Sequence, residues 1–370
     1  MITDPKILLV AGARPNFMKI APLVREFNKR DGLCNYRIIH TGQHYDRDMS
    51  EVFFEELEIP APHRHLDVGS GSHAEQTARI MVRFEEVCLA EKPKLVIVVG
   101  DVNSTLACAI VAKKLQVEVA HIEAGLRSRD RTMPEEINRV VTDSISDYFF
   151  VTERSGVDNL LSEGKEDGNV YFVGHVMIDN LLFQVKKLRE NRSTAPITAR
   201  LKLEHPRYGV VTLHRPSNVD SREILWQLMA TLADISRELP LIFPMHPRTQ
   251  SSIEKYRIDL PTTLICIRPL PYMEFLNLFM DAAVVLTDSG GIQEETTALG
   301  IPCLTLRENT ERPITVSEGS NILVGTDPSR IQSETRRILS GHGKTGSRPE
   351  LWDGKAAQRI AAILAAALAC

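Results

Sequence analysis

Several apolar segments of this chain end in residues that can bind phosphate or move protons. The most informative is Thr-Asp-Ser-Gly-Gly-Ile-Gln-Glu-Glu at 287–295, which follows an apolar strand and opens a helix. Gly290 and Gly291 let a phosphate approach the free amides at the positive helix end, and Ser289 is placed to cap it. Glu295 is placed to accept both hydroxyls of a ribose. We predict a diphosphate site; the alternative is a Gly-Gly turn with a solvated Glu-Glu pair.

A second candidate anion site follows the first apolar strand. The chain continues there as Gly-Ala-Arg-Pro at 12–15, with Lys19 one turn into the next helix. Arg14 and Lys19 put two cations near a helix N-terminus, where Pro15 suits a first helical position. The alternative is two solvated cations on a helix surface. Because no Gly-x-Gly-x-x-Gly occurs here, we expect no nicotinamide cofactor.

Carboxylates follow two further apolar strands. Asp101 comes directly after Gly100, and Glu123 stands between an apolar strand and Ala-Gly. A carboxylate in the second position is expected to lose hydration, which raises its pKa and suits it to proton transfer. The alternatives are that Asp101 caps the next helix and that Glu123 pairs with Arg127 or Arg129.

A run rich in arginine and glutamate follows Gly125. Pro134 predicts a helix start that puts Glu135 and Glu136 in the first turn, with Arg139 four residues after Glu135. We expect Gly125 to make the preceding loop mobile enough to close over a ligand. The alternative for the run is a charged helix face in solvent.

Histidines follow three of the expected strands. His214 and Arg215 come directly after an apolar run. Thr-Gly-Gln-His at 41–44 and His246 are weaker signals, because a lone histidine is more often structural than catalytic.

Short β-branched strands, alternating with segments of helical period, must position these residues. We expect two series of strands, at 6–10, 36–40, 95–99, 117–122, 148–151 and 170–173, and then at 208–213, 241–244, 263–267, 283–287 and 303–306. Between the early strands we expect helices at 17–29 and 46–57 and one that ends near residue 115. Such alternation predicts parallel α/β sheets covered on both faces.

The charged stretch 186–205 separates the two series, and we predict that it is a loop that marks the domain boundary. We expect one Rossmann-like domain over 1–185, joined by a C-terminal helix at 355–370, and a second over 186–354. Open parallel sheets bind ligands beyond the carboxyl ends of their strands, so two doubly wound domains are expected to bind in a cleft between them.

The composition agrees with two globular domains. The 370 residues exceed what one core usually organises, with 43% hydrophobic and 25% charged residues. A net charge of −4 gives no basic field, so we expect neither nucleic acid nor membrane as a partner. The six cysteines have no metal-ligand spacing, so we expect no metal site and a reducing, cytoplasmic environment.

In their order, these segments resemble the non-hydrolysing UDP-N-acetylglucosamine 2-epimerases, a family with the two-domain glycosyltransferase-B fold. The resemblance runs from about residue 6 to residue 327. Its carriers are Gly-Ala-Arg-Pro at 12–15 with Lys19, Thr-Gly-Gln-His at 41–44, Gly-Asp at 100–101, His-Ile-Glu-Ala-Gly-Leu-Arg at 121–127, Pro-Glu-Glu-Ile-Asn-Arg at 134–139, His-Arg at 214–215, Thr-Asp-Ser-Gly-Gly-Ile-Gln-Glu-Glu at 287–295 and Thr-Glu-Arg-Pro at 310–313.

The resemblance implies a homodimer that interconverts UDP-N-acetylglucosamine and UDP-N-acetylmannosamine without a metal or organic cofactor. It implies a catalytic set of Asp101, Glu123, Glu135 and His214. It implies that the UDP-sugar contacts Arg14, Lys19, Phe275, Ser289, Gly290, Gly291, Glu295 and Arg312.

The implied chemistry explains why acids, bases and cations occur together. The C2 proton of an N-acetyl sugar is not acidic, because no carbonyl lies beside C2. The family is understood to remove that proton as UDP leaves C1, which gives a 2-acetamidoglucal, and UDP returns after reprotonation on the opposite face. We expect Glu123 and Glu135 to transfer protons at C2 or to position the groups that do, with Asp101 and His214 in support.

Departures from the common family pattern leave further functions open. This chain has Ala13 and Asn16 where the usual bacterial form has Thr and Glu, and Arg-Pro-Ser-Asn at 215–218 where Arg-Arg-Glu-Asn is commoner. The nearest alternative substrate is a UDP-diacetamido-uronic acid. Arg129 or Arg131 would then face the carboxylate of that sugar. The pattern is also compatible with a hydrolysing 2-epimerase, a retaining glycosyltransferase and a nucleotide-sugar sensor without catalysis.

Overall fold

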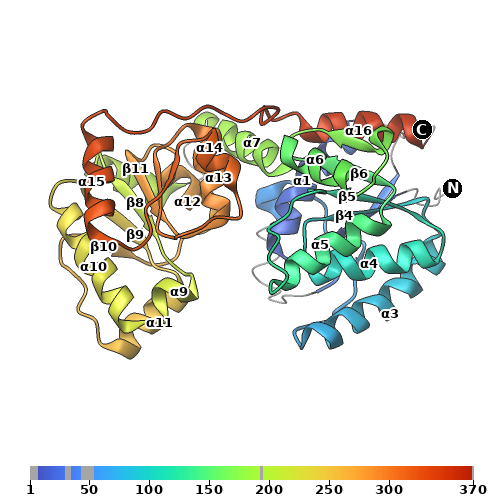
Figure 1. The fold of residues 1–370 in the computed structure, drawn as a ribbon, viewed down its shortest axis with the longest axis horizontal. Coiled ribbons are helices and arrows are strands. Elements are labelled where there is room, and N and C mark those ends of the chain that lie inside the picture. Colours follow the sequence, from blue (N-terminus) through green and yellow to red (C-terminus); the bar gives the residue numbers. More distant parts are fainter. Residues whose placement is uncertain (1–6, 30–34, 43–53, 192–194, 369–370) are drawn as a thin grey trace. The chain divides into compact units, whose positions relative to one another are not determined.

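The computed structural model describes all residues except 1–6, 30–34, 43–53, 192–194 and 369–370, and it leaves the Arg14 side chain undescribed. The chain divides into two compact units, Met1–Asn180 with Glu350–Cys370, and Leu181–Pro349. Each unit holds one parallel sheet with helices on both faces, which confirms the predicted fold class (Figure 1). We retain 1–185 with 355–370, and 186–354, as the proposed limits of the two domains.

The sheet of the first unit has seven parallel strands in the order β3-β2-β1-β4-β5-β6-β7. They are β1 (Ile7–Ala11), β2 (Tyr36–His40), β3 (Arg64–His65), β4 (Leu95–Val99), β5 (Glu118–Ile122), β6 (Tyr148–Val151) and β7 (Val170–Phe172). Every residue of β1 and β4 is buried, which is why both segments read as continuous apolar runs. The strand order reverses between β1 and β4, the point where open α/β sheets hold their ligands.

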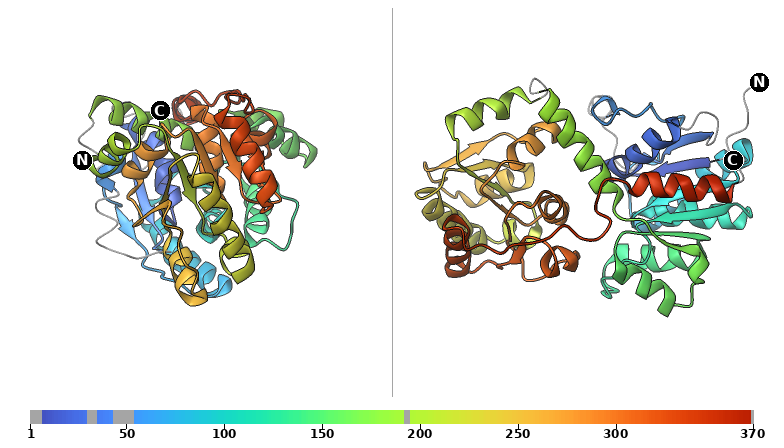
Figure 2. Two further views of the ribbon diagram at one scale, coloured as in Figure 1. Left: turned by 90° about the vertical axis from the view of Figure 1, so that its left-hand side faces the viewer. Right: turned by 90° about the horizontal axis from the view of Figure 1, so that it is seen from above.

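Helices cover both faces of this first sheet. They are α1 (Arg14–Asn28), α3 (His73–Glu91), α4 (Asn103–Lys114), α5 (Pro134–Ile145), α6 (Arg154–Ser162), α7 (Val176–Glu190) and α16 (Ala356–Ala367). The later part of α7 belongs to the second unit. The short helix η1 (Asp167–Asn169) lies between α6 and β7, and a helical turn at 54–57 follows the undescribed stretch. The last helix, α16, packs its buried face against α1 in one hydrophobic core. Figure 2 shows α16 in red against the unit that the N-terminal residues build.

The sheet of the second unit has six parallel strands in the order β10-β9-β8-β11-β12-β13. They are β8 (Gly209–Thr212), β9 (Leu241–Pro244), β10 (Leu264–Ile267), β11 (Val284–Thr287), β12 (Cys303–Thr305) and β13 (Asn321–Leu323). The helices are α8 (Pro196–Glu204), α9 (Pro216–Val219), α10 (Arg222–Ser236), α11 (Pro247–Tyr256), α12 (Tyr272–Phe279), α13 (Gly290–Leu299), α14 (Pro313–Ser317) and α15 (Pro328–Leu339). Here the strand order reverses between β8 and β11.

The prediction of a loop at 186–205 was wrong, because this stretch holds the end of α7 and the whole of α8. The carboxylate of Glu274 caps α8, since the backbone N–H groups of Ile197 and Thr198 donate to it at 3.0 and 2.9 Å. Glu274 lies 76 residues beyond Thr198, so no local pattern indicates this helix. The short strands β3 and β13 were also missed, and the helix predicted at 46–57 lies mostly outside the described residues.

Neither membrane spans nor metal clusters are found in the described parts of the chain. Among these residues no helix combines the length and the apolar character needed to cross a membrane. The same residues contain no group of three or more His, Cys, Asp or Glu side chains that could hold a metal ion. Four described cysteines, Cys88, Cys108, Cys266 and Cys303, are free thiols.

Candidate active site

Glu123 follows β5 at the carboxyl edge of the first sheet, and its carboxylate is paired with Lys19 of α1. A backbone φ of +68° turns the chain out of the strand at this residue. The side chain is only 3% exposed, and Oε2 lies 2.5 Å from Nζ of Lys19. The ion pair therefore joins the loop after β5 to α1, the helix that follows β1, across the point of strand reversal. Arg127, one of the partners considered from the sequence, is held instead by other carboxylates.

Asn16 of α1 ties the loop after β1 to the end of β4. Its Oδ1 accepts the backbone N–H groups of Gly12 and Ala13 at 3.2 and 2.9 Å. Its Nδ2 donates to the carbonyl oxygen of Val99 at 3.0 Å. An amide side chain both donates and accepts, so Asn16, one of the departures from the family pattern, serves as a cross-link between two strand ends.

Gly100 leaves room for the ion pair. It follows β4 with a φ of +71°, in the left-handed region that favours glycine. A Cβ atom on Gly100 would lie 3.0 Å from Nζ of Lys19 and 3.5 Å from Oε2 of Glu123. A side chain here would therefore crowd the pair as well as strain the backbone.

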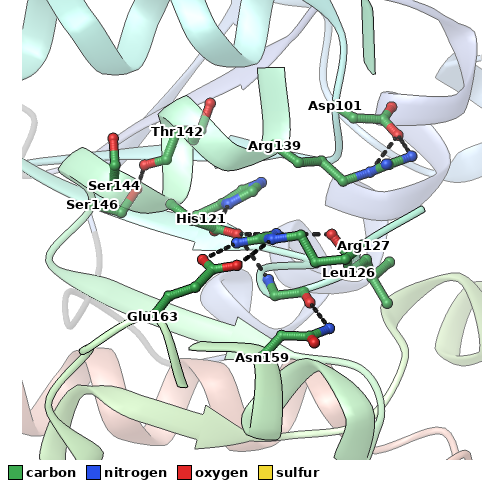
Figure 3. Close-up of polar contacts among 12 residues, drawn as sticks. Asp101, His121, Leu126, Arg127, Arg139, Thr142, Ser144, Ser146, Asn159 and Glu163 are labelled. Atoms are coloured by element: carbon green, nitrogen blue, oxygen red, sulfur yellow. Dashed lines mark hydrogen bonds and ion pairs between the residues drawn. The ribbon is translucent and has the colours of Figure 1, made fainter. Parts of the chain in front are cut away.

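Asp101 forms an ion pair and does not cap α4. The residue before α4 is Val102, and no side chain caps that helix. Instead, Oδ2 of Asp101 accepts Nε and Nη2 of Arg139 at 3.1 and 2.7 Å (Figure 3). The capping alternative was therefore wrong, and Asp101 connects β4 to α5.

The glutamates of α5 have different environments. The helix begins at Pro134, which confirms the prediction that Glu135 and Glu136 lie in its first turn. Glu136 is buried, contacts Nη1 of Arg139 at 2.6 Å, and accepts the backbone N–H groups of Ser128 and Arg129, both at 2.9 Å. Burial alone would raise the pKa of Glu136, but these hydrogen bonds outweigh it and lower the pKa. Glu136 therefore holds the loop, while Glu135 is only partly buried.

A buried network centred on Asp143 of α5 lies beneath the loop that carries Glu123. One oxygen of Asp143 lies 2.6 Å from Nδ1 of His121, and the other lies 2.7 Å from Nη1 of Arg127 and accepts the N–H of Gly125 at 3.0 Å. Both His121 and Asp143 are fully buried. Burial alone would raise the pKa of Asp143, but His121 and Arg127 outweigh it and lower the pKa.

The network extends to the neighbouring strand and helix. Arg127 donates to both oxygens of Glu163, at 2.9 and 2.6 Å, and Figure 3 shows the two side chains facing each other. Nε2 of His121 lies 2.8 Å from the carbonyl oxygen of Gly100, so each ring nitrogen faces an acceptor. The backbone on both sides of Glu123 is therefore fixed through side chains.

Gly125 is hydrogen-bonded through both of its backbone groups. Its carbonyl oxygen accepts Nδ2 of Asn159 at 2.9 Å, in addition to the bond that its N–H makes to Asp143. A Cβ on Gly125 would lie 2.2 Å from the carbonyl oxygen of Gly156. The glycine is thus required by close packing of two backbone segments, and the loop is tied down at this point.

In the second unit, Asp288 orders the turn that carries His214. Asp288 directly follows β11 and is fully buried. Its carboxylate accepts the N–H groups of His214 and Arg215 and Nδ2 of Asn218, at 2.9 to 3.2 Å, and lies 3.0 Å from Nδ1 of His214. Burial alone would raise the pKa of Asp288, but the His214 side chain and these N–H groups lower it. The His214 ring also packs against His246, with 5.4 Å between ring centroids.

The start of α13 is open where the diphosphate site was predicted. The helix begins at Gly290, and Ser289 is its N-cap residue, but the prediction that the Ser289 side chain caps the helix was wrong. Instead, the Ser289 N–H donates to Oγ1 of Thr287 at 3.0 Å. No atom beyond the chain neighbours and the helix's own backbone lies within 4 Å of a Cβ built on Gly291, so the first turn of α13 is accessible there.

Glu294 and Glu295 are both buried, so the alternative of a solvated pair was wrong. Oε1 of Glu295 accepts the hydroxyl of Tyr272 at 3.1 Å, and burial raises the pKa of Glu295 to about 8. Oε1 of Glu294 lies 3.0 Å from Nε of Arg312. The first two turns of α13 thus carry one carboxylate paired with an arginine and one bonded to a phenol.

A second carboxylate–arginine cluster lies beside the start of α13. Oε1 of Glu311 lies 2.8 Å from Nη2 of Arg215, and Oε2 lies 2.7 Å from Nη2 of Arg307. Burial alone would raise the pKa of Glu311, but the arginines, Arg307 above all, lower it to about 2. A Cβ on Gly290 would lie 2.8 Å from Oε1 of Glu311, so this carboxylate reaches the helix start.

The predicted residues are divided between the two units. Lys19, Asp101, Glu123 and Glu135 lie beyond the carboxyl ends of strands in the first unit. The second unit holds His214, Phe275, Ser289, Gly290, Gly291, Glu295 and Arg312, with the Phe275 ring 5.2 Å from that of Phe279. Arg14 begins α1 but its side chain is outside the description, and the Gln-His pair at 43–44 lies outside the described residues.

Sequence reasoning missed residues that support these groups. Asp288 directly follows an apolar strand, so the rule that selected Asp101 and Glu123 could also have selected it. The same rule could have selected His175, which follows β7 after a glycine. Asn16 and Asp143 lie inside helices and carry no local signal, because their partners come from other segments.

The chain is similar to known proteins over nearly its whole length. A family model described as UDP-N-acetylglucosamine 2-epimerase matches residues 26–365. The UDP-N-acetylglucosamine 2-epimerase of Methanocaldococcus jannaschii is 40% identical over 97% of this chain and 98% of its own length. The UDP-2,3-diacetamido-2,3-dideoxy-D-glucuronate 2-epimerase of Pseudomonas aeruginosa is 41% identical over 97% of this chain and 99% of its own.

A solved structure is similar over nearly the whole chain. The crystal structure of the Methanocaldococcus jannaschii UDP-GlcNAc 2-epimerase in complex with UDP-GlcNAc and UDP superposes with a TM-score of 0.83, at 40% sequence identity, over 97% of this chain and 99% of that one.

Proposed function

Since the chain belongs to the family of UDP-N-acetylglucosamine 2-epimerases, it is an epimerase, and we propose that it interconverts UDP-N-acetylglucosamine and UDP-N-acetylmannosamine. The proposal is supported by the relatives named above and by the chemistry of the two strand-end clusters. The reaction inverts C2 and needs a group that takes a proton, a group that gives one and a site that retains the leaving diphosphate.

The proposal depends most on the environment of Glu123. A carboxylate 3% exposed at the carboxyl edge of the sheet, with a lysine on one oxygen, is suited to take the C2 proton. As that proton moves to the carboxylate, the C2–H electrons form the C1–C2 double bond and the C1–O bond breaks. UDP leaves with the bonding electrons, and the product is the 2-acetamidoglucal.

The return step needs a proton donor on the face of C2 opposite to the acceptor. Protonation of the glycal at C2 from the opposite face generates positive charge at C1, where the diphosphate oxygen adds. We propose Glu135 as a proton-transfer group, with Asp101 and His214 in support. Asp101 is held by Arg139 and His214 by Asp288, which favours fixed positions for both.

The diphosphate is proposed to bind at the start of α13. The accessible amides of that first turn and the positive helix end suit an anion, and Ser289, Gly290 and Gly291 form this end. Arg14, Lys19 and Arg312 are the proposed cations, Glu295 the proposed ribose contact and Phe275 the proposed neighbour of the uracil.

Proton NMR in deuterated water tests the proposal. The protein is incubated with UDP-N-acetylglucosamine, and C2 and the products are followed over time. Formation of UDP-N-acetylmannosamine with deuterium at C2 is expected. Free N-acetylmannosamine with UDP would show a hydrolysing epimerase instead, and exchange without inversion would contradict the proposed return step.

A UDP-diacetamido-uronic acid is the second candidate substrate. The Pseudomonas aeruginosa relative named for that sugar is as similar to this chain as the Methanocaldococcus jannaschii relative. Arg129 and Arg131 are exposed, and with Lys165 they line a surface cavity of about 480 Å³ that could receive a carboxylate. Comparing kcat/KM for the two sugars decides between them, and Arg131→Ala should weaken only the reaction of the uronic acid if this candidate holds.

We further propose that the protein is a cytoplasmic homodimer. Apolar side chains are exposed on two helices of the first unit, Val82 and Leu89 on α3 at 62% and 58%, and Ile137 and Val140 on α5 at 50% and 37%. Such side chains favour burial against a second copy. The free thiols fit a reducing compartment. Light scattering should give twice the chain mass of 41.4 kDa, and Ile137→Glu should give the single chain mass.

A further inference from the structure

Gln293 lies in the motif that opens α13, but the proposed function gives it no role. The side chain is fully buried. Its Nε2 donates to the carbonyl oxygen of Ser289 at 3.2 Å. Its Oε1 accepts the hydroxyl of Thr310 at 2.6 Å and Nδ2 of Asn321 at 3.1 Å. One amide side chain therefore ties the start of α13 to the loop after β12 and to the start of β13.

The partners of Gln293 hold the backbone of Arg312 on both sides. The N–H of Arg312 donates to Oγ1 of Thr310 at 3.0 Å. The carbonyl oxygen of Arg312 accepts the hydroxyl of Thr315 at 2.8 Å, and Oγ1 of Thr315 accepts Nδ2 of Asn321 at 3.1 Å. These contacts close a ring of hydrogen bonds that runs through Gln293, Thr310, Arg312, Thr315 and Asn321.

The hydrogen-bond ring has no spare or mismatched group at its two hydroxyls. Thr310 donates to Gln293 and accepts the N–H of Arg312. Thr315 donates to the carbonyl oxygen of Arg312 and accepts from Asn321. Because a hydroxyl has one donor and can also accept, loss of either hydroxyl breaks two bonds of the ring at once. Gln293, Thr315 and Asn321 are fully buried, so water cannot easily replace a lost partner there.

The side chain of Arg312 lies against the same helix. Its Nε is 3.0 Å from Oε1 of Glu294, the residue that follows Gln293. Two consecutive residues of α13 therefore hold Arg312, one through its backbone and the other through its guanidinium. A guanidinium binds phosphate through N–H groups in a rigid fork, so the strength of binding depends on how the group is oriented.

From this geometry we infer that Gln293 and Thr310 are positioning residues that fix Arg312 beside the diphosphate at the start of α13. A cation that is held in place before the ligand arrives loses less conformational freedom on binding, which favours affinity. The effect concerns the diphosphate and not the nucleoside. The inference rests on the proposed function, because it takes Arg312 as a diphosphate contact.

The main test is the affinity of Thr310→Val for UDP and for uridine. Valine keeps the shape of threonine but has no hydroxyl, so it breaks both ring bonds of residue 310. The Kd for UDP, measured by calorimetry, should rise roughly tenfold, as expected when a hydrogen bond to a charged group is lost. The Kd for uridine, measured by proton NMR, should stay nearly unchanged. Thr310→Ser restores the hydroxyl and should restore the UDP affinity.

A double-mutant cycle with Arg312→Ala shows whether Thr310 acts through Arg312. In the Arg312→Ala background, Thr310→Val should have little further effect on the Kd for UDP. The matched control is Thr335→Val on α15, where a buried hydroxyl donates to the carbonyl oxygen of Ile331 at 2.7 Å. It should keep the wild-type affinity. Additive losses in the cycle, or equal losses of UDP and uridine affinity in Thr310→Val, would overturn the inference.

A second readout needs no ligand and separates this inference from the proposed function. Hydrogen exchange of the Arg312 backbone N–H, followed by NMR, should be faster in Thr310→Val and in Gln293→Met than in the wild type, but not in Thr310→Ser. If Gln293→Met does not fold, the two Thr310 variants decide. A wild type that does not bind UDP would refute the proposed function, whereas unchanged exchange in Thr310→Val would refute the role of the hydrogen-bond ring alone.

Discussion

Two carboxylates at strand ends of the first unit are held differently from one at a strand end of the second unit. Glu123 and Asp101 are each paired with a side-chain cation, Lys19 or Arg139. Asp288 in the second unit instead accepts backbone N–H groups that fix a turn. A carboxylate that accepts backbone N–H groups fixes the path of the backbone. A carboxylate held by a long, flexible side chain can leave that side chain and bind another group. The comparison fits our proposal that the proton acceptor lies in the first unit and the main diphosphate contacts lie in the second.

The helix starts show the same difference. At α1, the loop before the helix is tied to β4 by Asn16, and Lys19 reaches back to Glu123. At α13, the space around Gly291 is open, and Arg215 and Arg307 lie nearby with the carboxylate of Glu311. In our proposal, the start of α1 supports the proton acceptor Glu123, and the start of α13 offers its amides to the diphosphate.

The largest effect should come from removing the proton acceptor of the first unit. Glu123→Gln should lower C2 deuterium exchange by about 10² to 10⁴, the usual contribution of a general acid or base, while the Kd for the UDP-sugar stays nearly unchanged. NMR measures the exchange and calorimetry the binding. Glu118→Gln, at the exposed start of β5, is the control. Full exchange in Glu123→Gln would remove the assignment of chemistry to the first unit.

The network under Glu123 should be the next most sensitive part. Asp143→Asn leaves buried His121 and Arg127 facing a neutral amide, and breaking a buried ion pair typically costs about 3 to 5 kcal/mol. The free energy of unfolding in urea should fall accordingly. Asp220→Asn, which breaks a solvent-exposed pair with Arg248, should lower the free energy of unfolding far less. Equal losses in the two variants would contradict the view that burial makes the network important.

A side chain at the open helix start should weaken binding without unfolding the protein. Gly291→Val has space for its side chain and no left-handed φ to strain, but it covers the amides offered to the diphosphate. Each lost hydrogen bond to a charged group costs about 1.5 to 3 kcal/mol, so the Kd for UDP should rise at least tenfold. Calorimetry measures this, with Gly168→Val as the control at another open glycine. Unchanged UDP affinity would move the diphosphate site away from α13.

The last prediction concerns Glu295 and the pH dependence of stability. The pKa of this carboxyl is about 8 in the folded protein, against 4.5 for an ordinary glutamate. Between these values the folded state binds more protons than the unfolded state, so this group makes stability fall as pH rises, by up to about 1.4 kcal/mol per pH unit.

Urea unfolding at pH 5, 6.5, 8 and 9 measures this slope. Glu295→Gln lacks the group, so its stability relative to the wild type should rise from pH 5 to 8 and then level off. Asp288, whose pKa is lowered, should contribute the opposite slope and lose its stabilisation only in acid. Parallel curves for the wild type and Glu295→Gln would show that the Glu295 carboxyl is not desolvated.

The sequence predicted the strands of both sheets closely, with β2, β4, β6 and β9 at the expected residues. Strands buried on both faces appear as short apolar runs, and this signal is local. This local signal fails where a residue far along the chain stabilises the element, as Glu274 does by capping α8. It also fails for the short strands β3 and β13, which have too few residues to show a pattern.

The sequence by itself determined the parallel α/β class and which polar residues stand at strand ends, because both follow from the order of neighbouring residues. Only the tertiary structure decided the pairs. Lys19 and Glu123 are 104 residues apart, and Arg139 bonds Asp101 and Glu136. A charged side chain pairs with whichever group the packing of strands and helices brings within about 3 Å. The local sequence does not contain that information.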